Sequence, residues 1–226
     1  MKVSFAVIPG AGSAGLTWRP VAGRIGARVL PMPPGESVFE IAASLQPEVA
    51  ALPRPRVLVG TSAGGMAAIE IARRTTVDAL VFVAAGFGIT VGEAALQWLI
   101  DYPPDLHAKL ARVCLHDRSD LERQRLIVED YEACGQPDHV AHLTAVAAYR
   151  PEPLLDPPPT LVLWGAHDRA IPLEDQVELA KRMAGVLVPI ADAAHVPFLE
   201  QPDVVTGWLE LAGRLGARAS AENSLL

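Results

Sequence analysis

The chain contains little cysteine and few aromatic residues. Cys114 and Cys134 are the two cysteines among 226 residues, and aromatic residues make up 5%. Two cysteines do not build a disulfide framework, so we expect both to be free thiols. Basic residues are the minority of the charged ones, with 19 Lys and Arg against 26 Asp and Glu. The resulting net charge of −7 argues against nucleic-acid binding.

Long hydrophobic runs are missing as well. Half of the residues are hydrophobic, yet no uninterrupted apolar span is long enough to cross a bilayer. The apolar segment at residues 3–8 is too short for a secretory signal and is better interpreted as a first strand. We therefore expect a soluble, cytoplasmic protein with one α/β domain and a substantial core.

Apolar, β-branched runs alternate with helical patterns along most of the sequence. Strands are expected at residues 3–8, 28–30, 57–59, 79–84, 160–164 and 186–190. Helical patterns lie at residues 18–25, 38–52, 65–73, 173–183 and 202–215. Strands that are apolar almost throughout suit a parallel sheet buried on both faces. The alternation predicts an α/β fold with a doubly wound, mostly parallel sheet.

One stretch, residues 87–153, interrupts this alternation. It is helical by pattern and is punctuated by prolines, and Ser119 with Glu122 has the spacing of a capping box. We interpret it as a helical cap inserted into a core formed by residues 1–86 and 154–217. Residues 218–226 are expected to be a flexible tail.

The cap holds aromatic side chains that are candidates for substrate binding. Trp98, Tyr102 and Tyr131 are the three we expect to line an acyl pocket, although packing of a lid onto the core is the commoner role of such residues.

Residues 60–64, GTSAG, follow an apolar strand directly and run on into a helical pattern. This context is what a nucleophile elbow needs. The flanking glycines remove Cβ atoms that would clash in so tight a turn, which lifts the Ser62 hydroxyl clear of the strand tip. The pattern alone is weak in a chain with 18 glycines, and the strand-to-helix context strengthens it.

Two further candidates follow later strands. Asp168 comes after the strand at residues 160–164, and His195 lies in the loop after the last strand. A serine hydroxyl needs a base, and the base needs a carboxylate that holds its tautomer. Ser62, Asp168 and His195 are therefore predicted to form a catalytic triad. Asp192 is a competing acid, but its position favours a turn.

Three motifs surround these candidates: GTSAGG at residues 60–65, WGAHD at 164–168 and AHVPFLE at 194–200. A glycine-rich loop, VIPGAG at residues 7–12, follows the first strand. Over nearly the whole chain these features resemble the α/β-hydrolase fold superfamily, whose triad follows the same Ser, acid, His order. The resemblance implies a small esterase-like or thioesterase-like hydrolase with a helical cap. It also implies an oxyanion hole formed by the backbone N–H groups of Ala11 and Ala63.

The chain departs from the family pattern at three points. Pro9 stands where the family usually has a histidine that braces the oxyanion loop, and Ala194 stands where it usually has glycine. The proline leaves the backbone N–H of Ala11 available. The family's first two, antiparallel strands have no counterpart, so the fold is expected to be shortened at its N-terminus.

Two rival patterns are weaker. Residues 10–15, GAGSAG, formally match a dinucleotide-binding fingerprint, but Pro20 stands at the start of the following helix and no carboxylate closes the second strand. His139 and His142 have the spacing of one helix face, yet no third metal ligand accompanies them. We therefore expect no cofactor and no metal.

The resulting expectation is hydrolysis of a carboxylic ester, thioester or lactone of a small to medium apolar substrate through an acyl-serine intermediate. Two alternatives stay open. The same triad supports acyl transfer, perhydrolysis or a lyase or cyclase step, and a non-catalytic ligand-binding protein can retain the fold. The expected partner is a small acyl substrate, and the sequence leaves the oligomeric state open.

Overall fold

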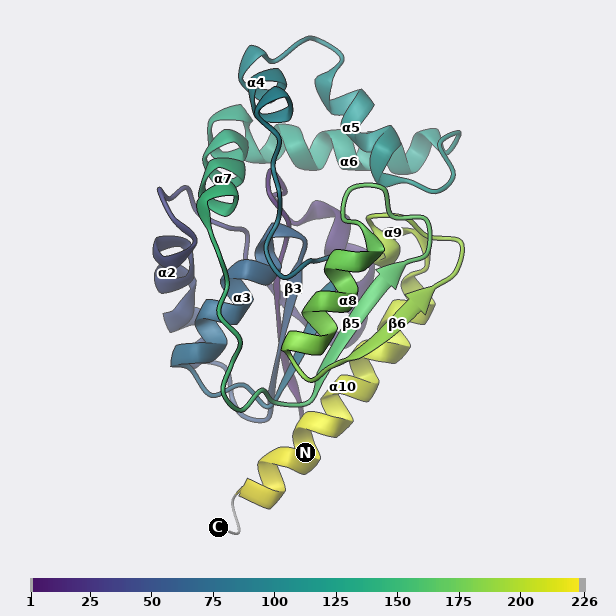
Figure 1. Cartoon of the computed structure of the whole chain (residues 1–226). Coiled ribbons are helices and arrows are strands. Elements are labelled where there is room, and N and C mark those ends of the chain that lie inside the picture. The colour runs from purple at the N-terminus through teal and green to yellow at the C-terminus, as the bar shows by residue number, and fades with distance from the viewer. Residues whose placement is uncertain (1, 224–226) are drawn as a thin grey trace.

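Six strands form a parallel sheet in the computed structural model, which describes residues 2–223 (Figure 1). They are β1 (Ser4–Ile8), β2 (Arg28–Val29), β3 (Arg56–Thr61), β4 (Ala79–Val83), β5 (Thr160–Gly165) and β6 (Val186–Ile190). Their order in the sheet is β2-β1-β3-β4-β5-β6, and every neighbouring pair is parallel. The doubly wound sheet predicted from the sequence is confirmed.

The chain changes its direction of travel across the sheet after β2. Because β1 lies between β2 and β3, the chain first builds to one side of β1 and then to the other. Ligands of such sheets bind where strand ends meet at this switch point. Ile8 pairs with Gly60 in the register of β1 and β3. The loop after β1 and the serine turn after β3 are therefore neighbours.

Helices cover both faces of the sheet. On one face lie α2 (Val38–Ala50), α3 (Ala63–Arg74) and α8 (Leu173–Arg182), and on the other lie α1 (Arg19–Ile25) and α10 (Pro202–Asn223). This two-sided cover is what the near-continuous apolar strands predict.

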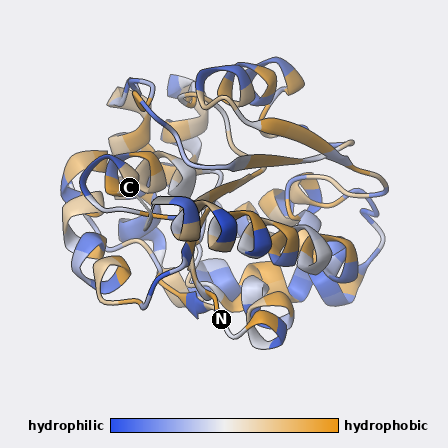
Figure 2. Ribbon diagram, turned by 90° about the horizontal axis from the view of Figure 1, so that it is seen from below, coloured by the Kyte–Doolittle hydropathy of each residue, from blue (hydrophilic) through white to orange (hydrophobic). Residues whose placement is uncertain are grey.

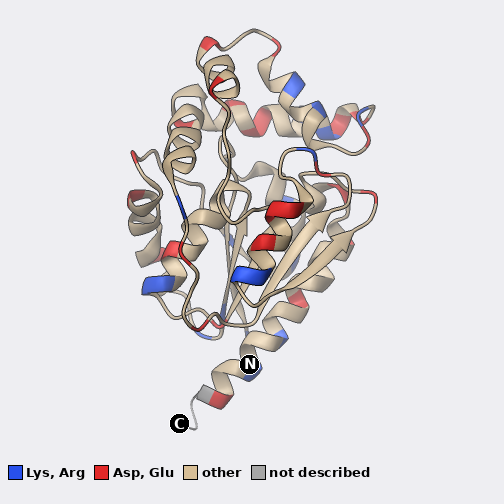
Figure 3. Cartoon of the chain, in the orientation of Figure 1, with Lys and Arg blue, Asp and Glu red and all other residues tan. Residues whose placement is uncertain are grey.

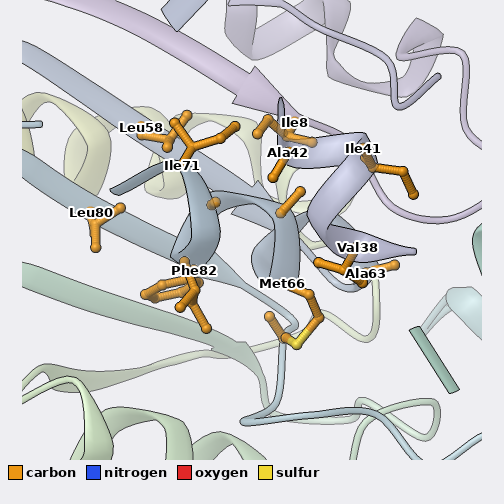
Figure 4. Close-up of a cluster of buried hydrophobic side chains, with 14 of the residues drawn as sticks. Ile8, Val38, Ile41, Ala42, Leu58, Ala63, Met66, Ile71, Leu80 and Phe82 are labelled. Carbon is orange, nitrogen blue, oxygen red and sulfur yellow. The ribbon is translucent and has the colours of Figure 1, made fainter. Parts of the chain in front are cut away.

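The central strands bury alternate side chains in two separate clusters. Leu58 and Phe82 pack with α2 and α3 in the cluster drawn in Figure 4, whereas Val57 and Val81 point to the opposite layer. The strands are hydrophobic in Figure 2. Figure 3 shows that the charged residues lie mainly on helices and loops. Each Å² of apolar surface buried in these clusters stabilises the fold by about 25 cal/mol. The loops after the strands therefore extend from a well-packed sheet.

Four helices lie between β4 and β5 and form the cap, above the carboxyl edge of the sheet in Figure 1. They are α4 (Glu93–Asp101), α5 (Leu106–Cys114), α6 (Leu121–Cys134) and α7 (Gln136–Ala148). The helical insertion is thus present, while its division from the core at residues 86/87 and 153/154 stays a prediction.

The predicted capping box at the start of α6 is wrong. The N-cap residue is Asp120, whose carboxylate accepts a hydrogen bond from the Arg123 N–H at 2.9 Å. Ser119 instead donates its hydroxyl to Asp117 at 2.6 Å. The aspartate outcompetes the serine because its charge also interacts favourably with the helix N-terminus.

The sequence predicts a flexible tail from residue 218, and the structure places the end of helix α10 over the first part of it. Helix α10 continues through Asn223, so residues 218–223 are helical, and residues 224–226 lie outside the described part. The physical reason is an anchor, since Ser220 hydrogen-bonds the buried Asp78 side chain. Cys114 and Cys134 are free thiols, as predicted. Within residues 2–223, none of the helices is long and apolar enough to span a bilayer.

Candidate active site

Ser62 occupies a strained turn between β3 and α3. Its backbone has φ 49° and ψ −121°, a conformation that L-residues rarely adopt. Its N–H donates to the Val83 carbonyl and its carbonyl accepts from the Gly65 N–H, both at 3.0 Å. A Cβ on Gly60 would lie 2.6 Å from the Gly65 Cα, and one on Gly64 would overlap carbonyl oxygens at the end of β1. The geometry is that of a nucleophile elbow.

His195 and Asp168 meet beside this turn. The His195 Nδ1 lies 3.1 and 3.2 Å from the two Asp168 carboxylate oxygens. The Asp168 side chain is fully buried and that of His195 is 13% exposed. Because a carboxylate only accepts, the His195 proton belongs on Nδ1, which leaves Nε2 as a free base.

The Asp168 carboxylate is held ionised by its surroundings. Burial by itself raises its pKa, but the neighbouring His195 and the N–H groups of Ile171 and Ala170 outweigh this and hold the pKa below its usual value. Those N–H groups donate to Asp168 Oδ1 at 3.1 and 2.8 Å. The buried Gln176 amide adds a contact of 3.3 Å to Oδ2. A fixed anion thus faces the imidazole.

The competing acid, Asp192, does not contact the His195 ring. It is exposed, with φ 53°, in the turn after β6. Its carboxylate lies instead near His116 and His167, close enough for the three to share a cation. The two imidazole rings are stacked, with centroids 3.9 Å apart and planes 22° apart. Their in-plane lone pairs therefore run side by side rather than toward one point, which makes a poor chelate.

Two backbone N–H groups lie beside the serine turn. Ala63 is the first residue of α3, so its N–H has no partner within the helix. Ala11 lies in the loop after β1, next to Gly10, where a Cβ would be 3.3 Å from the Ser62 Cβ. In residues 2–223, neither N–H makes a hydrogen bond. Both donors are free to bind a developing oxyanion.

A cavity of about 300 Å³ lies between the core and the cap. Ser62, His195 and Ala11 line it, and so does Tyr131. Most of its remaining wall is apolar and includes Ile89, Val91, Leu110, Val113, Ile127 and Leu143. In the described part of the chain, the Ser62 hydroxyl has no hydrogen-bond partner; such catalytic contacts often tighten only when substrate binds.

Two of the three predicted pocket aromatics lie elsewhere. Of Trp98, Tyr102 and Tyr131, only Tyr131 is part of the cavity wall. Tyr102 is 41% exposed at the C-terminal end of α4, and Lys109 lies over the Trp98 ring. Helical pattern alone could not distinguish the inner face of α6 from the outer face of α4.

The structure adds three cap residues that the sequence did not assign to the site. His139 lines the cavity and stacks on Tyr131, with ring centroids 5.1 Å apart. Burial lowers the pKa of His139 to about 4, and the nearby His107 and His142 add to this effect. Asp130 accepts a hydrogen bond from the Ser13 hydroxyl and His142 accepts one from the Gly12 N–H, both in the loop after β1. The available signal in the sequence was a histidine pair three residues apart within a helical pattern, but only the fold shows which loop these cap residues meet.

Comparisons with known proteins agree with this geometry. Residues 6–208 match the model of the alpha/beta hydrolase family. The chain belongs to that family. A search of curated proteins found no match.

Solved structures with the same fold are similar over nearly the whole chain. A thermophilic esterase has a TM-score of 0.81 at 23% identity, covering 95% of this chain and 90% of its own. Est816, described as an N-acyl homoserine lactone degrading enzyme, has a TM-score of 0.74 at 21% identity, covering 93% of both chains. The type II thioesterase BorB, from the borrelidin biosynthetic cluster, has a TM-score of 0.70 at 21% identity, covering 94% and 93%. Identities this low show a shared fold.

Proposed function

We propose that this hydrolase cleaves a carboxylic ester, thioester or lactone through an acyl-serine intermediate. The observation that carries the proposal is the His195 contact with a fully buried Asp168, at 3.1 Å, in the cavity that Ser62 also lines. A base with its tautomer fixed, beside a serine on a strained elbow, is the arrangement that activates a hydroxyl.

The reaction proceeds in two halves. The His195 Nε2 takes the Ser62 proton while Oγ attacks the substrate carbonyl carbon, and the carbonyl electrons move to oxygen. The N–H groups of Ala11 and Ala63 bind that oxyanion, and losing one such donor lowers the rate by about 10²–10³. His195 then protonates the departing alkoxide or thiolate, which leaves an acyl-Ser62 ester. Water, activated by the same imidazole, releases the carboxylic acid and restores the hydroxyl.

The cavity favours a modest apolar acyl group. About 300 Å³ lies at the small end of the range for ligand pockets, and the wall is mainly aliphatic. The similar structures described as an esterase, a thioesterase and a lactone degrading enzyme support an ester-like bond at the reacting carbon.

Covalent labelling tests the nucleophile. A fluorophosphonate probe is expected to label the wild-type chain once, on Ser62, and the Ser62→Ala variant not at all. Ser44→Ala is the matched control, since Ser44 lies exposed on α2, away from the cavity. Labelling that persists in Ser62→Ala, or a wild type that stays unlabelled, would contradict the serine mechanism.

A substrate panel then defines the bond that is cleaved. Chromogenic esters of increasing acyl length, a thioester and a lactone are compared as substrates of the wild-type enzyme that the probe labels. Hydrolysis is expected for short and medium acyl chains. An enzyme that is labelled but turns over only when another acyl acceptor is added, and then forms the acylated acceptor in place of the free acid, would instead be an acyltransferase.

A further inference from the structure

Asp130 of the cap is the centre of a hydrogen-bond network with the oxyanion loop, which we define as residues 10–17. Its side-chain oxygens accept from the Ser13 hydroxyl at 2.7 Å, the Thr17 hydroxyl at 2.7 Å and the Leu16 N–H at 2.8 Å. Its backbone carbonyl accepts from the Ala14 N–H at 3.4 Å. Asp130 is 2% exposed. A buried carboxylate with several donors fixes the groups that surround it.

His142, on the next cap helix, holds the same loop nearer to the proposed donor. Its Nδ1 accepts from the Gly12 N–H at 3.3 Å, and its Nε2 lies 3.2 Å from the Pro33 carbonyl. The carbonyl only accepts, so the proton belongs on Nε2. Burial lowers the pKa of His142 and the Pro33 carbonyl opposes this only in part, which keeps the ring neutral at neutral pH. The neutral ring satisfies both partners.

Gly12 allows the loop to lie against the cap because it has no side chain. It has φ 73°, and a β-carbon there would overlap the His139 ring. Ala11 therefore lies between two fixed neighbours, Gly10 against Ser62 and Gly12 against the cap histidines. Pro9, which precedes them, has no polar side chain with which the core could hold the loop.

We propose that Asp130 and His142 are positioning residues of the reaction: they hold the Ala11 N–H in the oxyanion hole. The hole is then complete only when the cap is seated, so binding of the acyl group under the cap and stabilisation of the oxyanion are coupled. This inference rests on the proposed acyl-serine mechanism.

Asp130→Asn tests the inference, because asparagine keeps the shape but replaces one accepting oxygen with a donor. We expect kcat to fall by about 10- to 100-fold, as for a weakened oxyanion donor, with KM changed less than about twofold. Binding of a trifluoromethyl ketone, whose adduct with Ser62 carries the oxyanion, is expected to weaken by the same factor.

Asp120→Asn is the matched control. Asp120 caps the same helix but bonds to Arg123 and has no hydrogen bond to residues 10–17 in the described structure. It is expected to leave kcat unchanged even if it lowers the melting temperature. Equal losses of kcat in the two variants would overturn the inference, because they would indicate general destabilisation of α6.

Amide hydrogen exchange gives a readout that does not depend on activity. Exchange at residues 10–17 is expected to speed up in Asp130→Asn and not in Asp120→Asn, even if the serine mechanism fails in the labelling test. Unchanged loop exchange, or an unchanged kcat in an enzyme that labels normally, would overturn the positioning role. If Asp130→Asn does not fold, the double variant Ser13→Ala/Thr17→Val removes both hydroxyl donors and carries the same expectations.

Discussion

At the scale of single residues, the site depends on backbone conformations and on hydrogen-bond partners more than on residue types. Ser62 is one of several serines, and it differs because its turn holds φ at 49°. Asp168 differs from Asp192 because it is buried and accepts hydrogen bonds from backbone N–H groups and His195. Chemistry of this kind follows from surroundings that fix one protonation state and one orientation.

The choice between the two acids is directly testable. Asp168→Asn is expected to lower kcat by about 10⁴, because the amide no longer holds the His195 tautomer that leaves Nε2 free. Asp192→Asn, at an exposed turn, is expected to change kcat by less than about twofold. Steady-state kinetics on one chromogenic ester checks both, and the reverse ranking would move the acid to the later loop.

A second residue-scale prediction concerns glycine. Gly64→Ala is expected to lower the free energy of unfolding by a few kcal/mol, because its Cβ would overlap carbonyl oxygens of Ile8 and Pro9. Gly23→Ala is the control: it lies in α1 with nothing within 4 Å of a new Cβ. It is expected to stabilise by about 0.5–1 kcal/mol. Urea unfolding of both variants measures the difference; a neutral Gly64→Ala would contradict the tight elbow.

At the scale of elements, the cap helices contribute to the site in different ways. α6 supplies Asp130 to the oxyanion loop and Tyr131 to the cavity wall, and α7 supplies His139 and His142. The end of α5 contacts the loop of His195, since the His195 N–H donates to the Cys114 carbonyl at 3.0 Å. α4 contributes less, because Trp98 and Tyr102 lie off the cavity. Selectivity is therefore expected to depend mainly on α5, α6 and α7.

Tyr131→Ala is expected to enlarge the cavity and shift the preferred ester toward longer acyl chains, with kcat/KM for a longer chain rising relative to a short one. Trp98→Ala provides the comparison, because it removes an aromatic ring of the same cap without opening the cavity. The ratio of kcat/KM values across an ester series measures the effect. A shift in both variants, or in neither, would count against Tyr131 as a wall residue.

At the scale of the whole molecule, an ion pair between Arg54 and Asp78 lies at the edge of the sheet remote from the site. Asp78 accepts from the Arg54 guanidinium at 3.1 Å and from the Arg56 N–H at 2.7 Å, and Ser220 of α10 joins them. Burial alone raises the Asp78 pKa, but these partners outweigh burial and lower it. The group joins the start of β3 to the C-terminal helix and opposes unfolding from that end.

Asp78→Asn is expected to lower the free energy of unfolding at pH 7 by about 1.5–3 kcal/mol, as for loss of hydrogen bonds to a charged group, because Asp78 is buried while the Arg54 side chain is 39% exposed. A lowered folded pKa gives stability that is present above the unfolded value near 3.9 and is lost as the pH falls through the folded pKa. The difference between wild type and variant is therefore expected to shrink as the pH falls below about 3.9, the unfolded value. Asp156→Asn, at an exposed position, is the control. A difference that stays constant with pH would contradict the ion pair.

The parallel sheet and the tight turn at Ser62 could be predicted from the sequence, and so could the proposal that Ser62, Asp168 and His195 act together. Apolar β-branched runs such as those of β3 and β4 suit strands buried on both faces, and their alternation with helical patterns predicts parallel pairing. The glycines beside Ser62 permit a tight turn. Both features depend on residues that are close together along the chain, so the residue pattern and spacing are enough to predict them. The strand predicted at residues 57–59 is longer in the structure, because pairing with β4 extends β3 to Thr61.

The contacts between the cap and the core could not be predicted from the sequence. Asp130 and Ser13 are far apart along the chain, and no local pattern links a helix carboxylate to a distant glycine-rich loop. The inward face of α6, the outward face of α4 and the anchoring of α10 through Ser220 were decided in the same way. Each depends on contacts between segments that are distant along the chain. The free energy of those contacts comes from burial and hydrogen bonds whose partners the sequence alone does not identify.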